Sequence, residues 1–261
     1  SSVSVVAQDV IPQPNNISYS KGYFTLNKGL KAVTNLTGKD FKVLNQFTSD
    51  DMDMPIISMK KPSKAYNVRL ICTGTALQAT QAQDSARLQG YELEVSPKSI
   101  TIQSLTPTGL FYGLLTLAQL EKGRQIPCVK VKDTPRFPYR GLMIDCSRHF
   151  WTKKFIMKQL DAMAYFKLNR FHWHLTDGGG WRMEVKQYPR LTNETAYRTQ
   201  SDWVKWWMEK DRKYCPVGTP GAYGGYYTQQ DIKDIVRYAA ARHITVIPEI
   251  EMPGHSDEVV Y

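Results

Sequence analysis

The chain has 261 residues, enough for one large domain or two modest ones, and its 42% hydrophobic content is ordinary for a globular protein. These figures exclude a disordered chain, a collagen-like chain and a disulfide-stapled miniprotein. The sequence contains no run of about 18 apolar residues, so no membrane span is predicted. Lys and Arg (34) outnumber Asp and Glu (24), which gives a formal charge of +10, but the basic residues are scattered. We therefore interpret them as a solvated surface rather than a nucleic-acid site.

Neither the cysteines nor the first residues carry a targeting or redox motif. The four cysteines are Cys72, Cys128, Cys146 and Cys215. They lie far apart, which disfavours a zinc ribbon or a thioredoxin-type pair. The stretch 1–6 lacks the basic and apolar regions of a signal peptide, so any export signal has been removed or was never present.

The first half of the chain predicts a small α+β domain. Residues 91–95 and 100–103 alternate between apolar and polar side chains around a Ser-Pro-Lys-Ser turn, which predicts a hairpin with one buried face. Residues 109–120 carry leucines at helical spacing, so a helix is expected to pack on that sheet. A further short strand is expected at 68–71. We assign residues 1–134 to this domain.

Two prolines at positions 135 and 138 mark a domain boundary, and the pattern changes after it. Strands are expected at 142–145, 169–175 and 244–250. Thr152 is expected to cap one intervening helix, and a capping box at 228–231 to open the other. This order predicts parallel strands with helical crossovers, in a doubly wound sheet or a (β/α)8 barrel over residues 135–261. The apolar run 244–250 predicts a strand covered on both faces.

The carboxyl ends of these three strands are unusually polar, and active sites of parallel α/β folds lie at those ends. The polar segments are 145–149, 172–177 and 249–256. A guanidinium such as Arg148 offers a donor fork suited to adjacent hydroxyls or a carboxylate, although a surface ion pair is its plainer interpretation. Asp177 precedes three glycines and is either a turn residue or an anchored carboxylate. His255, after a Pro-Gly turn, is either a helix cap or a pH-sensitive partner of a carboxylate.

His172 and His174 share one face of their strand, which leaves two interpretations open. They are two imidazole ligands of a metal ion, or a packed and hydrogen-bonded pair in the wall of the fold. We favour the packed pair, because the further ligands of a metal site are not evident in the sequence.

A cluster of tryptophans and an acidic pair also invite a functional interpretation. Trp203, Trp206 and Trp207 share a helical face, where core packing is the default and stacking against a sugar the alternative. Asp257 and Glu258 resemble a glycosidase dyad, but we assign them to the first turn of a helix, where acidic residues are favoured.

Four motifs resemble the β-N-acetylhexosaminidases of glycoside hydrolase family 20. Segments 139–150, 169–182 and 248–256 are similar to the first three strands of that family's barrel, and 109–115 resembles a helix of its small N-terminal domain. The resemblance covers most of the chain from about residue 90. It implies a two-domain glycoside hydrolase that removes terminal N-acetylglucosamine or N-acetylgalactosamine with retention of configuration, without metal or cofactor.

The resemblance also implies roles for four residues. Arg148 would bind the hydroxyls on carbons 3 and 4 of the terminal sugar. Asp177 and His255 would form a hydrogen-bonded chain that supports the acid-base Glu and tunes its pKa. Glu251 would occupy an acidic position one layer behind the sugar. The partners would be glycans with terminal N-acetylhexosamine, and the compartment periplasmic, secreted or lysosomal.

One element of the family pattern is absent. The family's catalytic Asp-Glu pair follows a His-x-Gly-Gly type motif at the fourth strand, and the chain ends at Tyr261, after the third. Residues 135–261 number 127, against about 250 for a complete barrel. We therefore expect a truncated chain, inactive by itself, with an open sheet edge. A metal-dependent barrel hydrolase and a non-catalytic glycan-binding module are the alternatives.

Overall fold

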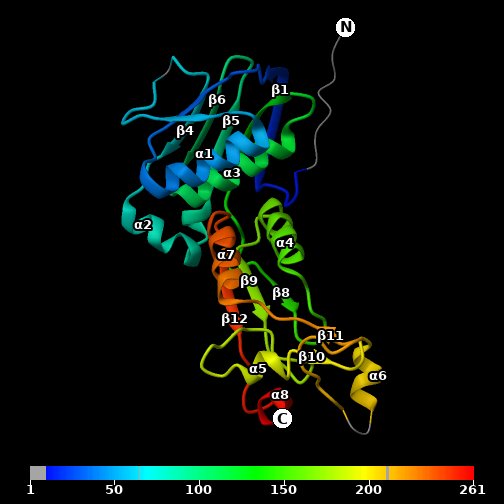
Figure 1. Ribbon diagram of the computed structural model, residues 1–261. Coiled ribbons are helices and arrows are strands. Elements are labelled where there is room, and N and C mark those ends of the chain that lie inside the picture. The colour runs from blue at the N-terminus through cyan, green and yellow to red at the C-terminus, as the bar shows by residue number, and fades with distance from the viewer. Residues whose placement is uncertain (1–9, 64, 210–211) are drawn as a thin grey trace. The chain divides into compact units, whose positions relative to one another are not determined.

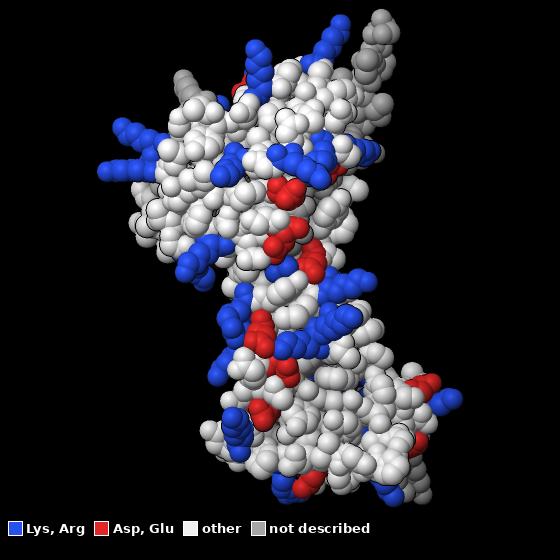
Figure 2. All heavy atoms as spheres, turned by 45° about the horizontal axis from the view of Figure 1, so that its top comes forward, with Lys and Arg blue, Asp and Glu red and all other residues white. Residues whose placement is uncertain are grey.

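The computed structural model describes residues 10–63, 65–209 and 212–261. The chain divides into two compact units (Figure 1). The first unit runs to Arg140 and includes Tyr165–Lys167, and the second comprises Gly141–Ala164 and Leu168–Tyr261. On the face seen in Figure 2, basic side chains are spread among acidic ones and do not gather into one patch.

The first unit contains a mixed seven-stranded sheet in the order β1-β7-β5-β6-β4-β2-β3. Its strands are β1 (Asn16–Thr25), β2 (Ala32–Thr34), β3 (Ile56–Ser58), β4 (Val68–Cys72), β5 (Tyr91–Val95), β6 (Ile100–Ser104) and β7 (Gln125–Asp133). Its helices are α1 (Gly38–Met52), α2 (Ala76–Gln81) and α3 (Pro107–Leu120), with 3₁₀ turns at Ala82–Asp84 and Arg87–Gln89. The expected strand 68–71, hairpin and helix are confirmed, so this unit is α+β as predicted.

The core of the first unit lies between the sheet and its helices α1 and α3 (Figure 1). Helix α3 begins at Pro107, two residues before the predicted start, because Thr106 caps it by accepting a hydrogen bond from the Gly109 nitrogen. A Cβ atom on Gly113 would lie 2.5 Å from Cγ2 of Ile102. Glycine therefore allows the helix to approach the sheet closely.

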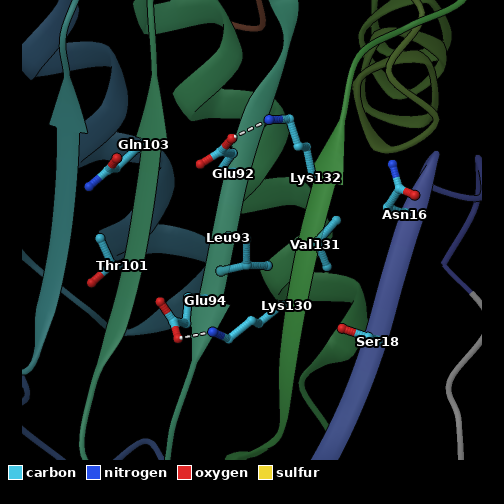
Figure 3. A pocket seen from close by; sticks show the side chains of 10 residues that line it. All are labelled: Asn16, Ser18, Glu92, Leu93, Glu94, Thr101, Gln103, Lys130, Val131 and Lys132. Carbon is cyan, nitrogen blue, oxygen red and sulfur yellow. Dashed lines mark ion pairs between the residues drawn. The ribbon is translucent and has the colours of Figure 1, made fainter.

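The opposite face of this sheet is polar and open (Figure 3). Glu92 and Glu94 of β5 point away from the helices and pair with Lys132 and Lys130 of β7, at 2.8 and 3.0 Å. The period-two alternation of the sequence thus produces one apolar and one charged face.

The second unit contains three parallel strands in the order β12-β9-β8. The strands are β8 (Gly141–Asp145), β9 (Arg170–His174) and β12 (Thr245–Glu249). Helix α4 (Lys153–Tyr165) connects the first two strands, and α7 (Gln229–Ala240) precedes the third. Smaller elements are α5 (Arg190–Asn193), β10 (Tyr197–Arg198), α6 (Trp203–Met208), β11 (Tyr223–Gly224) and α8 (Asp257–Val260). The predicted order of strands and helices is confirmed, as are the Thr152 cap and the capping box at Thr228 and Asp231.

One prediction about this sheet is wrong. β12 is not covered on both faces, because Thr245 and Pro248 are exposed and the rest of the strand is half-buried. On β8, Met143 is 53% exposed. Among the described residues, each of these strands pairs only with β9, so both lie at an open sheet edge, whereas β9 between them is mostly buried.

None of the helices in the described parts of the chain combines the length and the apolar composition needed to cross a bilayer.

Candidate active site

The loops after the three parallel strands converge on the carboxylate of Asp177. Its Oδ2 atom lies 2.7 Å from Nη2 of Arg148, 3.1 Å from Nε2 of His174 and 3.1 Å from Nδ1 of His255. Arg148 follows β8, His174 ends β9 and His255 follows β12. The structure therefore brings together the three polar segments that were predicted to lie at one rim of the sheet.

Asp177 is both a turn residue and a buried carboxylate, so the two interpretations of it are compatible. Its Oδ1 accepts a hydrogen bond from the Gly178 nitrogen, and its carbonyl accepts one from Gly180. The side chain is only 4% exposed. A Cβ atom on Gly179 would lie 2.9 Å from the Arg148 Cα, so this loop passes directly against the loop after β8. The glycines thus allow the backbone to carry Asp177 to the rim.

Arg148 is held in place on two sides. Its Nη1 contacts Oδ2 of Asp145 at 2.9 Å while Nη2 contacts Asp177, and Oδ1 of Asp145 accepts hydrogen bonds from the backbone nitrogens of Ser147 and Arg148. One third of the side chain is exposed, and its guanidinium carbon lies 5.9 Å from the centre of the Trp203 ring. A fixed and partly open guanidinium is suited to bind a polar ligand.

His255 is the exposed member of the group. Its backbone has a φ of 54°, and 62% of its side chain is exposed. It does not cap α8, because Ser256 takes that position. Its ring is therefore anchored to Asp177 on one side and accessible on the other, which favours the interpretation as a partner of a carboxylate.

The two histidines of β9 form the packed pair that the sequence favoured. Both contact Oε2 of Glu249, His172 through Nε2 at 2.7 Å and His174 through Nδ1 at 2.6 Å. Sequence reasoning found no carboxylate for them. Glu249 supplies one because the parallel pairing of β12 with β9 sets it opposite His174.

His174, Glu249 and Glu251 offer ligand atoms within 4.8 Å of one another, which is a possible metal cluster. The hydrogen bond with Asp177 raises the pKa of His174 to about 9 against the effect of burial, and Glu249 reinforces this shift. Both ring nitrogens of His174 already contact carboxylates, Nδ1 with Glu249 and Nε2 with Asp177, so the geometry favours the hydrogen-bonded interpretation of this cluster.

The remaining predicted residues lie around this group. The backbone nitrogen of Glu251 donates to Oγ1 of Thr176, and its half-buried side chain lies beside Glu249. Of the three tryptophans, only Trp206 is in the core, whereas Trp203 is half-buried and Trp207 is 46% exposed. The core-packing interpretation is therefore wrong for Trp207, because α6 spans only six residues and turns one side to solvent.

Asp257 and Glu258 lie in the first turn of α8, as predicted. The burial of Glu258, which is only 2% exposed, was not predicted from the sequence. Burial raises the pKa of this carboxyl to about 7, and within the described residues neither of its oxygens has a hydrogen-bond partner.

Two buried arginines were also missed by sequence reasoning. Arg182 donates to the carbonyls of Cys146, Ser147, Gly179, Ala196 and Gly225. Arg198 donates to the carbonyls of Arg148 and Gly179, at 2.9 and 3.1 Å. The two side chains hold the loops after β8 and β9 together, so they position Arg148 and Asp177 through the backbone. The only signal for Arg182 was the Gly-Trp-Arg end of the second motif.

Comparisons with known proteins agree with the motifs. Residues 7–134 match the model for glycosyl hydrolase family 20, domain 2, and residues 137–261 match the catalytic domain of the same family. The chain is 36% identical to a beta-hexosaminidase of Porphyromonas gingivalis, covering 95% of this chain and 30% of that protein. It is 35% identical to an N,N'-diacetylchitobiase of Vibrio harveyi, covering 98% and 28%.

A solved structure shows the same fold. The exo-β-N-acetylglucosaminidase of Vibrio harveyi in complex with N-acetylglucosamine superposes with a TM-score of 0.75 at 30% identity. The match covers 100% of this chain and 39% of that one. The chain spans less than a third of the length of either relative above.

Proposed function

Because the chain belongs to glycosyl hydrolase family 20, we propose that it is part of an exo-β-N-acetylhexosaminidase. The protein releases terminal N-acetylglucosamine or N-acetylgalactosamine from glycans and glycoconjugates. The observation that carries this proposal is the meeting of Arg148 and His255 on one carboxylate oxygen of Asp177. These three residues come from three different strand ends, in the motif positions that the family resemblance singles out.

Each residue has a role in the proposed reaction. Arg148 binds the hydroxyls on carbons 3 and 4 of the terminal sugar, with the guanidinium oriented by Asp145 and Asp177. Asp177 orients His255, and the exposed side of the His255 ring supports the acid-base Glu. Glu251 lies behind these groups as an acidic neighbour of Glu249.

The chemistry is retaining and substrate-assisted. The 2-acetamido oxygen of the substrate attacks the anomeric carbon while the acid-base Glu protonates the departing oxygen, which gives an oxazolinium-like intermediate. Water then opens this intermediate, with the same Glu acting as base. The motif that carries this Glu and the Asp that polarises the acetamido group is not found in residues 1–261, so we expect this segment to be inactive by itself. No metal or cofactor takes part in this scheme.

We also propose the division into an N-terminal α+β domain, 1–134, and a partial barrel, 135–261. The family models, which meet between residues 134 and 137, support this division. An exported location, periplasmic, secreted or lysosomal, follows from the family resemblance.

Hydrolysis of an aryl N-acetyl-β-glucosaminide by the longest natural form of the protein tests the proposal. We expect hydrolysis by the long form and none by residues 1–261. Binding of glycans without hydrolysis by the long form would overturn the assignment in favour of a binding module. Stoichiometric zinc, with activity lost to a chelator, would favour the metal-dependent hydrolase instead.

A further inference from the structure

His174 lies between two carboxylates and has a separate contact with each. Its Nδ1 is 2.6 Å from Glu249 and its Nε2 is 3.1 Å from Asp177, while the side chain is only 5% exposed. Ionised carboxylates accept hydrogen bonds and donate none. Both contacts are therefore hydrogen bonds only when both ring nitrogens carry a proton. The geometry indicates a buried imidazolium.

The surroundings of this ring require a positive charge. The titratable and charged groups that face it are Asp145 and Arg148 from β8 and its loop, His172 and Asp177 from β9 and its loop, and Glu249 and Glu251 from β12 and its end. Four of these groups are carboxylates and one is a guanidinium. A neutral His174 would leave most of this acidic charge uncompensated in a partly buried site.

The effect of His174 reaches His255 through Asp177. Nη1 of Arg148 is 3.4 Å from Nε2 of His174, so two cations approach Asp177 from the same side. His255 then meets a carboxylate whose charge is already compensated by two fixed neighbours. Such a carboxylate holds the ring of His255 in position.

We propose that His174 is a positioning residue for the hydrolysis: a buried cation, held by Glu249, that fixes the Asp177 carboxylate against which the ring of His255 rests. This inference rests on the proposed function. It assigns to the second histidine of the β9 pair a role that His172 does not share, because His172 contacts Glu249 but has no contact with Asp177 among the described residues.

The pair provides a matched test in the longest natural form of the protein. His174→Gln removes the charge and leaves a side chain that cannot donate to both carboxylates. The groups coupled to Asp177 then bind protons more tightly, so we expect both limbs of the pH profile of kcat/KM for an aryl N-acetyl-β-glucosaminide to move to higher pH by about one unit. We expect kcat to fall about tenfold, with KM little changed. His172→Gln, the control, should keep the wild-type profile.

Two results would overturn the inference. One is a folded His174→Gln protein with the wild-type pH profile, and the other is an equal shift in His172→Gln. If His174→Gln does not fold in a thermal melt, Glu249→Gln decides, because it retains the ring and removes one of its anionic partners. Loss of this anion makes the groups around Asp177 bind protons less tightly, so we expect a shift to lower pH, opposite to that of His174→Gln. An unchanged profile would again overturn the inference. A wild-type protein without hydrolytic activity would instead overturn the proposed function, so the two failures are distinguishable.

Discussion

Lys167 in the first unit and His174 in the second are both buried cations, and they are stabilised to different extents. In the first unit, Nζ of Lys167 lies 3.0 Å from the Tyr91 hydroxyl, 2.7 Å from that of Thr116 and 3.7 Å from the carboxylate of Asp133. In the second, His174 is within 3.1 Å of two carboxylates. Burial lowers the pKa of Lys167 to about 8, whereas the hydrogen bond with Asp177 raises that of His174 to about 9.

The difference shows that burial alone does not decide the direction in which a pKa shifts. Lys167 and His174 have side chains that are equally hidden, at 5% exposed each. Lys167 obtains two neutral hydroxyls and one distant carboxylate, which do not offset its desolvation. His174 obtains two carboxylates at hydrogen-bond distance, which do. The surroundings of Lys167 therefore destabilise its charged form, whereas the surroundings of His174 stabilise its charged form.

The largest effect is expected from removing the charge of Asp177, the buried carboxylate that Arg148, His174 and His255 share. Asp177→Asn leaves Arg148 and His174 without their shared charge, and a carboxamide cannot accept from all the donors that Asp177 serves. We expect the free energy of unfolding to fall by about 3 kcal/mol, and hydrolysis to be lost. Denaturant unfolding and a rate assay on the longest natural form measure the two effects.

The matching change in the first unit is Asp133→Asn. Its carboxylate is 3.7 Å from Lys167, and the amine can lose its proton, so the cost should be at most about 1 kcal/mol at pH 9. Equal destabilisation by the two substitutions would contradict the comparison.

A smaller effect is expected at Arg148, which touches the buried anion but is itself partly open. Arg148→Ala should raise KM for an aryl N-acetyl-β-glucosaminide by about 10- to 100-fold, the equivalent of losing hydrogen bonds to a charged group. Steady-state kinetics measure this, with a thermal melt to verify folding. Unchanged kinetics would remove Arg148 from the sugar site.

Much of the fold could be predicted from the sequence, but the partners of the buried charges could not. The hairpin 91–103 and the helix that follows are local patterns, fixed by alternation, spacing and a capping threonine. The contact of His174 with Glu249 depends on the register between two strands that are 75 residues apart at this point. The acceptors of Arg182 are backbone carbonyls of four separate segments. Neither arrangement leaves a periodic trace, because no single segment contains both partners.

Lys167 and His174 should also give opposite dependences of stability on pH. The pKa of His174 is raised from about 6.5 in the unfolded chain to about 9. The charged ring therefore makes its full contribution to the free energy of unfolding below pH 6.5. This contribution, at most about 3 kcal/mol, is lost as the pH rises to 9. The pKa of Lys167 is lowered from about 10.4 to about 8, so its destabilisation is complete below pH 8 and is relieved above it.

Melting temperatures of wild type, His174→Gln and Lys167→Met between pH 6 and pH 9.5 separate the two contributions. The advantage of wild type over His174→Gln should shrink toward pH 9. Relative to Lys167→Met, wild type should gain stability as the pH rises from 8 to 9.5, because the buried amine loses its charge and methionine does not titrate. A constant advantage of wild type over His174→Gln across this range would mean that the ring is not charged in the folded protein.

The smallest effect is expected where charges pair on an open surface. Glu94 and Lys130 are 58% and 74% exposed, so water already solvates both ends of their 3.0 Å ion pair (Figure 3). Glu94→Gln should change the free energy of unfolding by at most about 0.5 kcal/mol, and 1 M salt should abolish even that difference. The pair has nearly the same length as the contact between Arg148 and Asp177, so the two substitutions Glu94→Gln and Asp177→Asn compare the same charge removal in two environments. A cost at Glu94 as large as at Asp177 would mean that distance, and not burial, sets the strength of these pairs.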